Sequence, residues 1–166
     1  SAQASPHGLS SLANHFLAGL IATVPEVFPL IANTVNAYRR LAPGSWAPKT
    51  VSWAPYNYAA AVRVAAETEA MTRLELRLPG SDLNPHLAMA AMLAAGLDGI
   101  ARKAPLAAPP IASGGPNEIP EGVERLPADL LDGRCDHPPG GLDPDGPLWP
   151  LCSGAGAFQY GLDGQR

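Results

Sequence analysis

The residues with the clearest chemical potential lie in one short alternating stretch, from Thr72 to Pro79. Arg73, Glu75 and Arg77 fall on one face of an extended segment and leucines on the other, because successive side chains of a strand point to opposite sides of a sheet. The leucine face belongs in a core, and a carboxylate between two guanidinium groups suits anions and metal ions. The same pattern also fits a ladder of exposed ion pairs, each worth little. The octet alone leaves both interpretations open.

Composition limits the classes of function. The chain has 166 residues, of which 46% are hydrophobic, enough for one ordinary domain with a core. A formal net charge of -4 provides no large basic surface, so any anion site must be local. The longest apolar run, 87–97, is shorter than the roughly 20 residues that cross a bilayer. We therefore expect a cytoplasmic protein without nucleic-acid or membrane partners, and the start without Met predicts a piece of something longer.

Helices are predicted on both sides of the charged stretch. The first begins at Ser10 or Ser11 and ends at Val24-Pro25, and Pro25 starts a second, less regular helix. A third helix has Asn84 as its N-cap and runs to about Lys103. It is apolar nearly all round, which is typical of a buried helix.

Three strands are predicted at 50–53, 60–64 and 72–79, and an antiparallel meander is their simplest arrangement. Arg63 is embedded in the second strand and faces opposite its apolar neighbours. A loop with two prolines and a glycine carries Trp46 before the first strand. Because an exposed indole is costly, we expect it either to close over a ligand or to pack on its own protein.

A series of short blocks keeps one order over residues 15–127, and together they are far more specific than any one of them. The blocks are Asn36-Ala37-Tyr38-Arg39-Arg40-Leu41, Pro43-Gly44, Ala47-Pro48, Arg63, Arg73-Leu74-Glu75-Leu76-Arg77, Asn84-Pro85-His86-Leu87-Ala88, Ala94-Ala95-Gly96-Leu97-Asp98-Gly99-Ile100 and Arg125-Leu126-Pro127. In this order and spacing the chain resembles the C-terminal part of the glutamine synthetase catalytic domain. The resemblance implies an α+β fold, with antiparallel strands packed with helices, over residues 1–132.

The resemblance implies ATP-dependent ligation of an amine to the γ-carboxyl of glutamate through γ-glutamyl phosphate, with Mg²⁺ or Mn²⁺ at the site. By position, Glu75 matches a metal-binding carboxylate. Arg77 matches the catalytic arginine at the transferring phosphoryl group and glutamate, and Arg40 the arginine that binds the substrate carboxylate. Arg63 matches an arginine at the nucleotide phosphates, and Arg73 is assigned to the nucleotide side as well. Guanidinium groups that grip oxyanions suit phosphoryl transfer.

Two positions depart from the ammonia-using members of the family. Trp46 stands where they carry a glutamate that handles ammonium, and its loop resembles the γ-glutamylpolyamine synthetase branch. Trp46 is therefore expected to bind the substrate amine as an aromatic wall. Tyr58 stands where those members carry another phosphate-binding arginine. We expect a ligase for an amine other than ammonia; the alternatives are glutamine synthetase proper and a non-catalytic remnant or assembly protein.

The resemblance also implies parts that this sequence does not contain. The family's other metal-binding carboxylates and its active-site histidine belong to an earlier half of the domain, and a neighbouring subunit completes each site. We therefore expect a homo-oligomeric, dodecamer-like parent and an isolated chain without activity. Residues 133–166 are rich in proline and glycine, contain both cysteines, and are expected to be a disordered or frame-shifted tail with free thiols.

Overall fold

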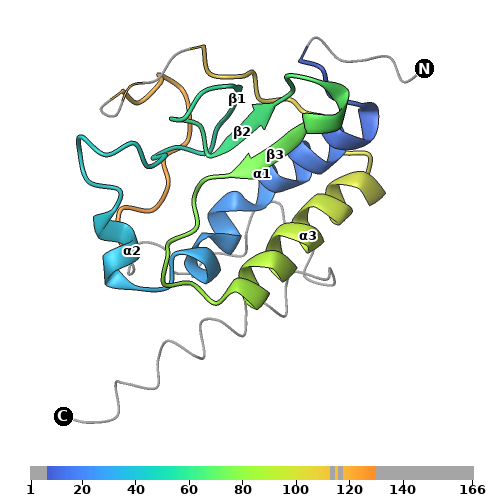
Figure 1. Ribbon diagram of the computed structural model, residues 1–166. Coiled ribbons are helices and arrows are strands. Elements are labelled where there is room, and N and C mark those ends of the chain that lie inside the picture. The colour runs from blue at the N-terminus through green and yellow to red at the C-terminus, as the bar shows by residue number, and fades with distance from the viewer. Residues whose placement is uncertain (1–6, 113–114, 116–117, 130–166) are drawn as a thin grey trace, which may run out of the picture.

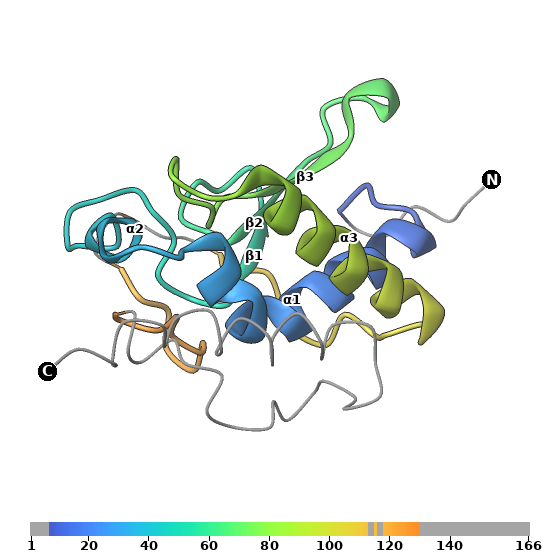
Figure 2. The ribbon, with the colours of Figure 1, turned by 90° about the horizontal axis from the view of Figure 1, so that it is seen from below.

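The computed structural model describes residues 7–112, 115 and 118–129 (Figure 1). The predictions for the 133–166 tail and its two cysteines lie outside these residues. The elements in chain order are α1 (Ser11–Ile31), α2 (Val35–Arg39), β1 (Trp53–Pro55), β2 (Val62–Ala65), the 3₁₀ helix η1 (Glu69–Met71), β3 (Arg73–Leu76) and α3 (Pro85–Ala101). Figures 1 and 2 show α1 and α3 side by side next to a small sheet.

The sheet is mixed, with the order β1-β2-β3. β2 and β3 are antiparallel, as predicted, but β1 runs parallel to β2, so the predicted meander is wrong. The backbone at Tyr56 explains the difference: its φ of 54° is left-handed and turns the chain, and 57–61 then return to the start of β1. The predicted strand at 50–53 instead bridges at Thr50 to Arg125, in antiparallel orientation.

α1 is one helix of 21 residues, although the sequence predicted a break at Pro25. Ser10 caps it as predicted, because its side chain accepts a hydrogen bond from the backbone N–H of Ala13. Each interior proline removes a hydrogen bond and costs about 3 kcal/mol. Burial of the helix beyond Pro25 offsets this cost, since burying one large apolar side chain contributes about 1.5–3 kcal/mol. The buried side chains there are Val27, Phe28 and Ile31.

By length and composition α1 could cross a bilayer, but 61% of that stretch is buried inside the protein. Its first half packs with β1, β2 and α3 in a core that includes Leu17, Leu20, Trp53, Val62 and Ala95. This degree of burial is typical of a helix in a protein core.

α1 and α3 approach each other through glycines. A Cβ built on Gly99 would lie 2.6 Å from the Cα of Gly19, and one built on Gly96 would collide with the ring of Phe16. Real Cβ atoms do not come so close to other heavy atoms. The two backbones are therefore near contact where these helices cross.

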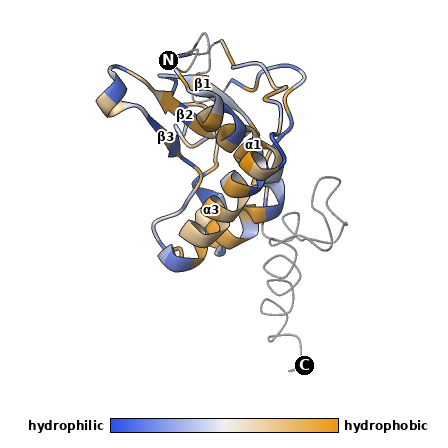
Figure 3. Cartoon of the chain, turned by 90° about the vertical axis from the view of Figure 1, so that its right-hand side faces the viewer, coloured by the Kyte–Doolittle hydropathy of each residue, from blue (hydrophilic) through white to orange (hydrophobic). Residues whose placement is uncertain are grey.

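α3 begins and ends close to its predicted limits, and the Asn84 side chain accepts hydrogen bonds from the N–H groups of His86 and Leu87. The prediction that α3 is buried all round is wrong. Its small residues face α1, whereas the Met89 side chain is 63% exposed and Leu93 and Leu97 are also exposed. Figure 3 shows apolar residues continuing over α3. Among the described residues no element covers this outer side, which composition alone could not reveal.

Candidate active site

The pairing of β2 with β3 places the charged residues on one face of the sheet. Arg63 and Glu75 are partners in the register, so their side chains point to the same side. The Nη1 of Arg63 donates to Oε2 of Glu75 over 2.7 Å, and the Nε of Arg73 donates to Oε1 of the same carboxylate over 2.8 Å. Glu75 therefore binds one arginine with each of its oxygens. The predicted alternation is confirmed, and the leucines of β3 pack on the core.

The pair of Arg63 with Glu75 is less exposed than the contacts of Arg73. The Arg63 side chain is 11% exposed and that of Glu75 is 29% exposed, whereas Arg73 is 46% exposed and also lies 3.5 Å from Glu67. The hydrogen bond from Arg63 lowers the pKa of Glu75, and the bond to Glu75 raises the pKa of Arg63. Arg63 and Glu75 thus form a half-buried pair, which the interpretation as an exposed ladder does not describe.

Arg77 follows β3 and belongs to the same cluster. Its backbone N–H donates to the carbonyl of Ala61, which continues the β2–β3 pairing by one step. Burial lowers the pKa of Arg77, and the charges of Arg63 and Arg40 lower it further. Its Nη1 is buried and has no hydrogen-bond partner among the described residues. A buried guanidinium N–H group without an acceptor is unfavourable unless a ligand supplies one.

Arg40 reaches the cluster from the end of α2. Its Nη2 donates to the backbone carbonyl of Leu78, which follows directly after Arg77 in the chain. Burial lowers the pKa of Arg40, and its Nε also lacks a partner within the described part of the chain. The four arginines of the prediction are therefore gathered from the end of α2, from β2, and from β3 and the residues after it. Three of them, Arg40, Arg63 and Arg77, have a buried guanidinium N–H group without a partner among the described residues.

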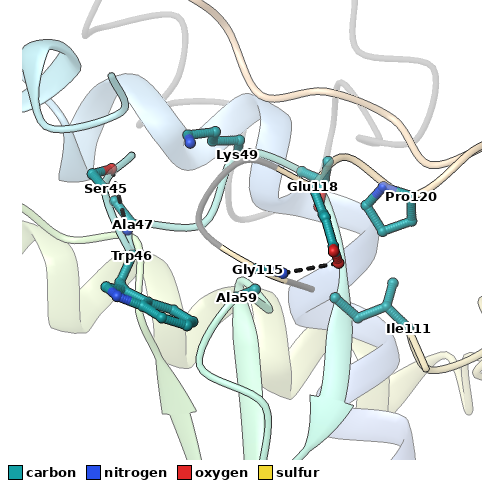
Figure 4. Close-up of a pocket in the computed structure, with 10 residues that line it drawn as sticks. Ser45, Trp46, Ala47, Lys49, Ala59, Ile111, Gly115, Glu118 and Pro120 are labelled. Atoms are coloured by element: carbon teal, nitrogen blue, oxygen red, sulfur yellow. Dashed lines mark hydrogen bonds between the residues drawn. The ribbon is translucent and has the colours of Figure 1, made fainter. Parts of the chain in front are cut away.

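Trp46 lies in the loop that follows Arg40 in the chain. Ser45 ties this loop to the arginine, because its hydroxyl donates to the Arg40 carbonyl over 2.7 Å. The Trp46 side chain is 57% exposed, so it does not bury its ring on its own protein. It lines a small pocket with Ala59, the chain neighbour of Tyr58 (Figure 4). The pocket is therefore lined by the loop that follows Arg40 and by the loop between β1 and β2.

Two charged residues of this pocket carried no signal in the sequence. They are Lys49 and Glu118. The Oε2 of Glu118 accepts a hydrogen bond from the Gly115 N–H over 3.0 Å, as Figure 4 shows. Glu118 comes from a segment without regular pattern, so only the folded chain brings it near Trp46.

The described residues of this cluster do not by themselves provide enough ligands for a divalent metal ion. Mg²⁺ and Mn²⁺ need several oxygen ligands around one point. Glu75 offers one carboxylate whose oxygens already accept hydrogen bonds from two arginines. In the part of the chain that the structure describes, no three His, Cys, Asp or Glu residues are grouped to hold an ion. The donor set present therefore fits anionic oxygen better than a cation.

Comparison with known proteins identifies the family of this chain. Residues 1–133 match the glutamine synthetase catalytic domain. Type-1 glutamine synthetase 2 of Dictyostelium discoideum is 39% identical over 131 residues, which are 78% of this chain and 25% of that protein. Gamma-glutamylethanolamide synthetase GlnA4 of Streptomyces coelicolor is 43% identical over 108 residues, 65% of this chain and 23% of that protein.

A solved structure of a GmaS/ADP complex is similar in fold and sequence. The TM-score is 0.63 at 35% identity, over 78% of this chain and 30% of that chain. The chain spans about a quarter of the length of the curated relatives described above. The match over 1–133 covers most of the chain, and by that match the chain belongs to the glutamine synthetase catalytic-domain family, whose members are ligases.

Proposed function

We propose that this chain forms part of the site of an ATP-dependent ligase that joins glutamate to an amine through γ-glutamyl phosphate. The observation that carries the proposal is the set of buried guanidinium N–H groups without acceptors, on Arg77, Arg63 and Arg40. Phosphoryl transfer depends mainly on positioning and on neutralising charge at phosphate oxygens. Guanidinium groups provide both through paired hydrogen bonds.

The proposed roles follow from the place of each group. Arg77, half-buried beside Arg63, donates to the phosphoryl group under transfer and to glutamate, and Arg40 binds the substrate carboxylate. Arg63 and the more exposed Arg73 bind the nucleotide phosphates. Glu75 holds these two arginines apart from each other and in place, since each donates to a different one of its oxygens.

The described residues support binding of ATP more directly than binding of a divalent ion. The GmaS relative was solved with ADP, and the open arginine N–H groups suit the phosphates of such a nucleotide. A family-type Mg²⁺ or Mn²⁺ would need more carboxylates than Glu75, supplied by protein outside the described residues. For the same reason we propose that a homo-oligomeric parent completes the site and that the isolated chain does not turn over.

Nucleotide binding by the purified chain tests the arginine cluster. Arg77→Gln removes the buried group without a partner. Arg102→Gln is the matched control, because Arg102 also carries one positive charge but lies on the outside, paired with Asp98 by a 2.8 Å hydrogen bond from its Nε. A hydrogen bond to a charged group contributes about 1.5–3 kcal/mol, so ATP affinity measured by calorimetry should fall roughly tenfold or more in the first variant. It should stay within about twofold in the control.

Two results would contradict the cluster assignment. Equal losses in both variants would mean that ATP responds to overall charge and not to this site. A wild-type chain that does not bind ATP at millimolar concentration would mean that these residues alone provide no phosphate site.

We propose further that the acceptor is an amine other than ammonia. Trp46 supports this, because its exposed indole beside a pocket offers an apolar and cation–π surface for an alkylamine. GlnA4, by its name, makes a γ-glutamylethanolamide. Other relatives are glutamine synthetases, such as that of Thermus thermophilus. Ammonia is therefore the competing acceptor, and a non-catalytic remnant is the remaining alternative.

The acceptor can be tested in a full-length ligase that carries this segment. Trp46→Glu should shift the ratio of kcat/KM values towards ammonium over ethylamine by roughly tenfold, or about 1.4 kcal/mol, because a carboxylate can bind ammonium and accept its proton. Trp46→Phe, which keeps an aromatic face, should retain most of the original preference. Identical ratios in the wild type and both variants would show that Trp46 does not face the amine.

A further inference from the structure

Tyr58 contacts two of the clustered arginines through its ring. The guanidinium carbon of Arg63 lies 4.4 Å from the ring centroid, and that of Arg77 lies 5.0 Å from it. Both distances are within the range of cation–π attraction. The Tyr58 side chain is 53% exposed and comes from the loop between β1 and β2, so it is not part of the core.

The two arginines need something to keep them together. Their positive charges repel, and the charge of Arg63 acts on Arg77 directly. Arg63 has a second anchor, since it donates to Glu75 over 2.7 Å. Arg77 has a buried Nη1 with no hydrogen-bond partner among the described residues, and its guanidinium group lies over the ring of Tyr58. The negative face of the ring attracts a guanidinium group in a way that an aliphatic side chain cannot.

We propose that Tyr58 is a positioning residue, whose ring holds the Arg77 guanidinium beside that of Arg63 so that both can bind one phosphate-bearing ligand. The ligand part of this inference rests on the function proposed above. The ring face does the holding and the phenolic hydroxyl is dispensable. An arginine fixed before binding loses less freedom when the ligand arrives, which raises affinity without a new contact.

The arrangement of the arginines can be measured without any ligand. In ¹⁵N NMR spectra of the full chain, the ring should shift the Nε–Hε signals of Arg63 and Arg77, and Arg102 serves as the internal reference. Tyr58→Phe keeps the ring and should keep both shifts. Tyr58→Leu keeps apolar bulk but has no π face, so both signals should move towards that of Arg102.

The effect on binding is measured with inorganic pyrophosphate as the probe. We expect its affinity to fall about three- to tenfold in Tyr58→Leu, from the loss of a cation–π contact at a half-exposed site. In Tyr58→Phe it should stay within about twofold of the wild type. Because Tyr58 is exposed, both variants should keep the wild-type unfolding temperature, which shows that the difference is not a loss of fold.

The two measurements separate this inference from the proposed function. The Nε–Hε signals of Arg63 and Arg77 could change in Tyr58→Leu and stay as in the wild type in Tyr58→Phe, while the chain does not bind pyrophosphate. That result would support the positioning role and contradict the phosphate site. Unchanged arginine signals in Tyr58→Leu would overturn the positioning role. Equal loss of the shifts and of affinity in both variants would also overturn it, because the hydroxyl and not the ring face would then be responsible.

Discussion

Replacing Gly99 with alanine tests the close packing of α1 on α3, on which the position of the sheet and its arginines depends. The added methyl group would lie 2.6 Å from the Cα of Gly19 and 2.7 Å from its backbone nitrogen, and it would also meet the carbonyl oxygen of His15. All three are backbone atoms. No flexible side chain can move aside, so one helix must shift relative to the other.

Two opposite effects determine how much the free energy of unfolding changes in Gly99→Ala. Alanine is better than glycine inside a helix by about 0.8–1.0 kcal/mol, which alone would stabilise the chain. Overpacking of a well-packed contact costs typically about 1–3 kcal/mol and occasionally more. Backbone contacts below 3 Å belong at the upper end of that range, so we expect the free energy of unfolding to fall by about 1–2 kcal/mol. For a chain of this size that lowers Tm by about 2–8 °C.

Urea unfolding followed by circular dichroism measures this difference. Gly115→Ala is the control, because its new methyl group would be 3.6 Å from the nearest atom, an ordinary contact. That variant should be unchanged or more stable by up to about 1 kcal/mol. If Gly99→Ala stabilised the protein by the helix-propensity term alone, the two helices would have to be farther apart than the structure places them, and the packing argument would be refuted.

Two further predictions concern the cluster and α3. Because the pKa of Glu75 is lowered in the folded chain, its pairing with Arg63 contributes stability that is present above the carboxyl's ordinary pKa of 4.5 and is lost as pH falls through the lower folded value. The unfolding free energy of Glu75→Gln should therefore vary less with pH below 4.5 than that of the wild type, and parallel curves would contradict the pairing. On α3, peroxide should oxidise exposed Met89 before Met92, which packs against the core. Peptide mass mapping measures this order, and oxidation of Met92 first would contradict the prediction.

Local patterns predicted the parts of the fold that depend on local geometry. Alternation placed Arg73 and Glu75 on one face, because a strand has a period of two whatever surrounds it. Asn84 followed by proline located the start of α3, because an N-cap acts on the next few residues only. These predictions are confirmed by the register of β3 and by the cap of α3.

The wrong predictions depended on distant atoms. The break at Pro25 follows from a local penalty, but burial of Phe28 and its neighbours outweighs it. The parallel pairing of β1 depends on the left-handed backbone of Tyr56, which a tyrosine rarely adopts. The open side of α3 depends on what packs beside it, and an apolar sequence contains no such information.

The candidate site likewise has a part that local sequence patterns predicted and a part that they could not predict. Strand alternation grouped Arg73, Glu75 and Arg77, whereas the roles proposed for them came from a resemblance to a family. The contact of Tyr58 with two arginines was not predictable, because the direction of a side chain in an irregular loop has no sequence period. The same holds for Glu118, which lines the same pocket as Trp46.

The acidic net charge of the chain and an anion site are compatible because they act over different distances. Charges on the surface are screened within about 8 Å at physiological salt, so the net charge of -4 governs only the approach of an anion. At the proposed site, a ligand oxygen would accept hydrogen bonds from Arg77 and Arg40, where partial burial weakens screening. Glu75 already accepts hydrogen bonds from Arg63 and Arg73, whereas the carboxylates of Glu75 and Asp82 act on Arg77 and Arg40 only through their charge. We therefore expect affinity for a phosphate-bearing ligand to depend on the arginines whose N–H groups are open, and less on how many positive charges the chain carries.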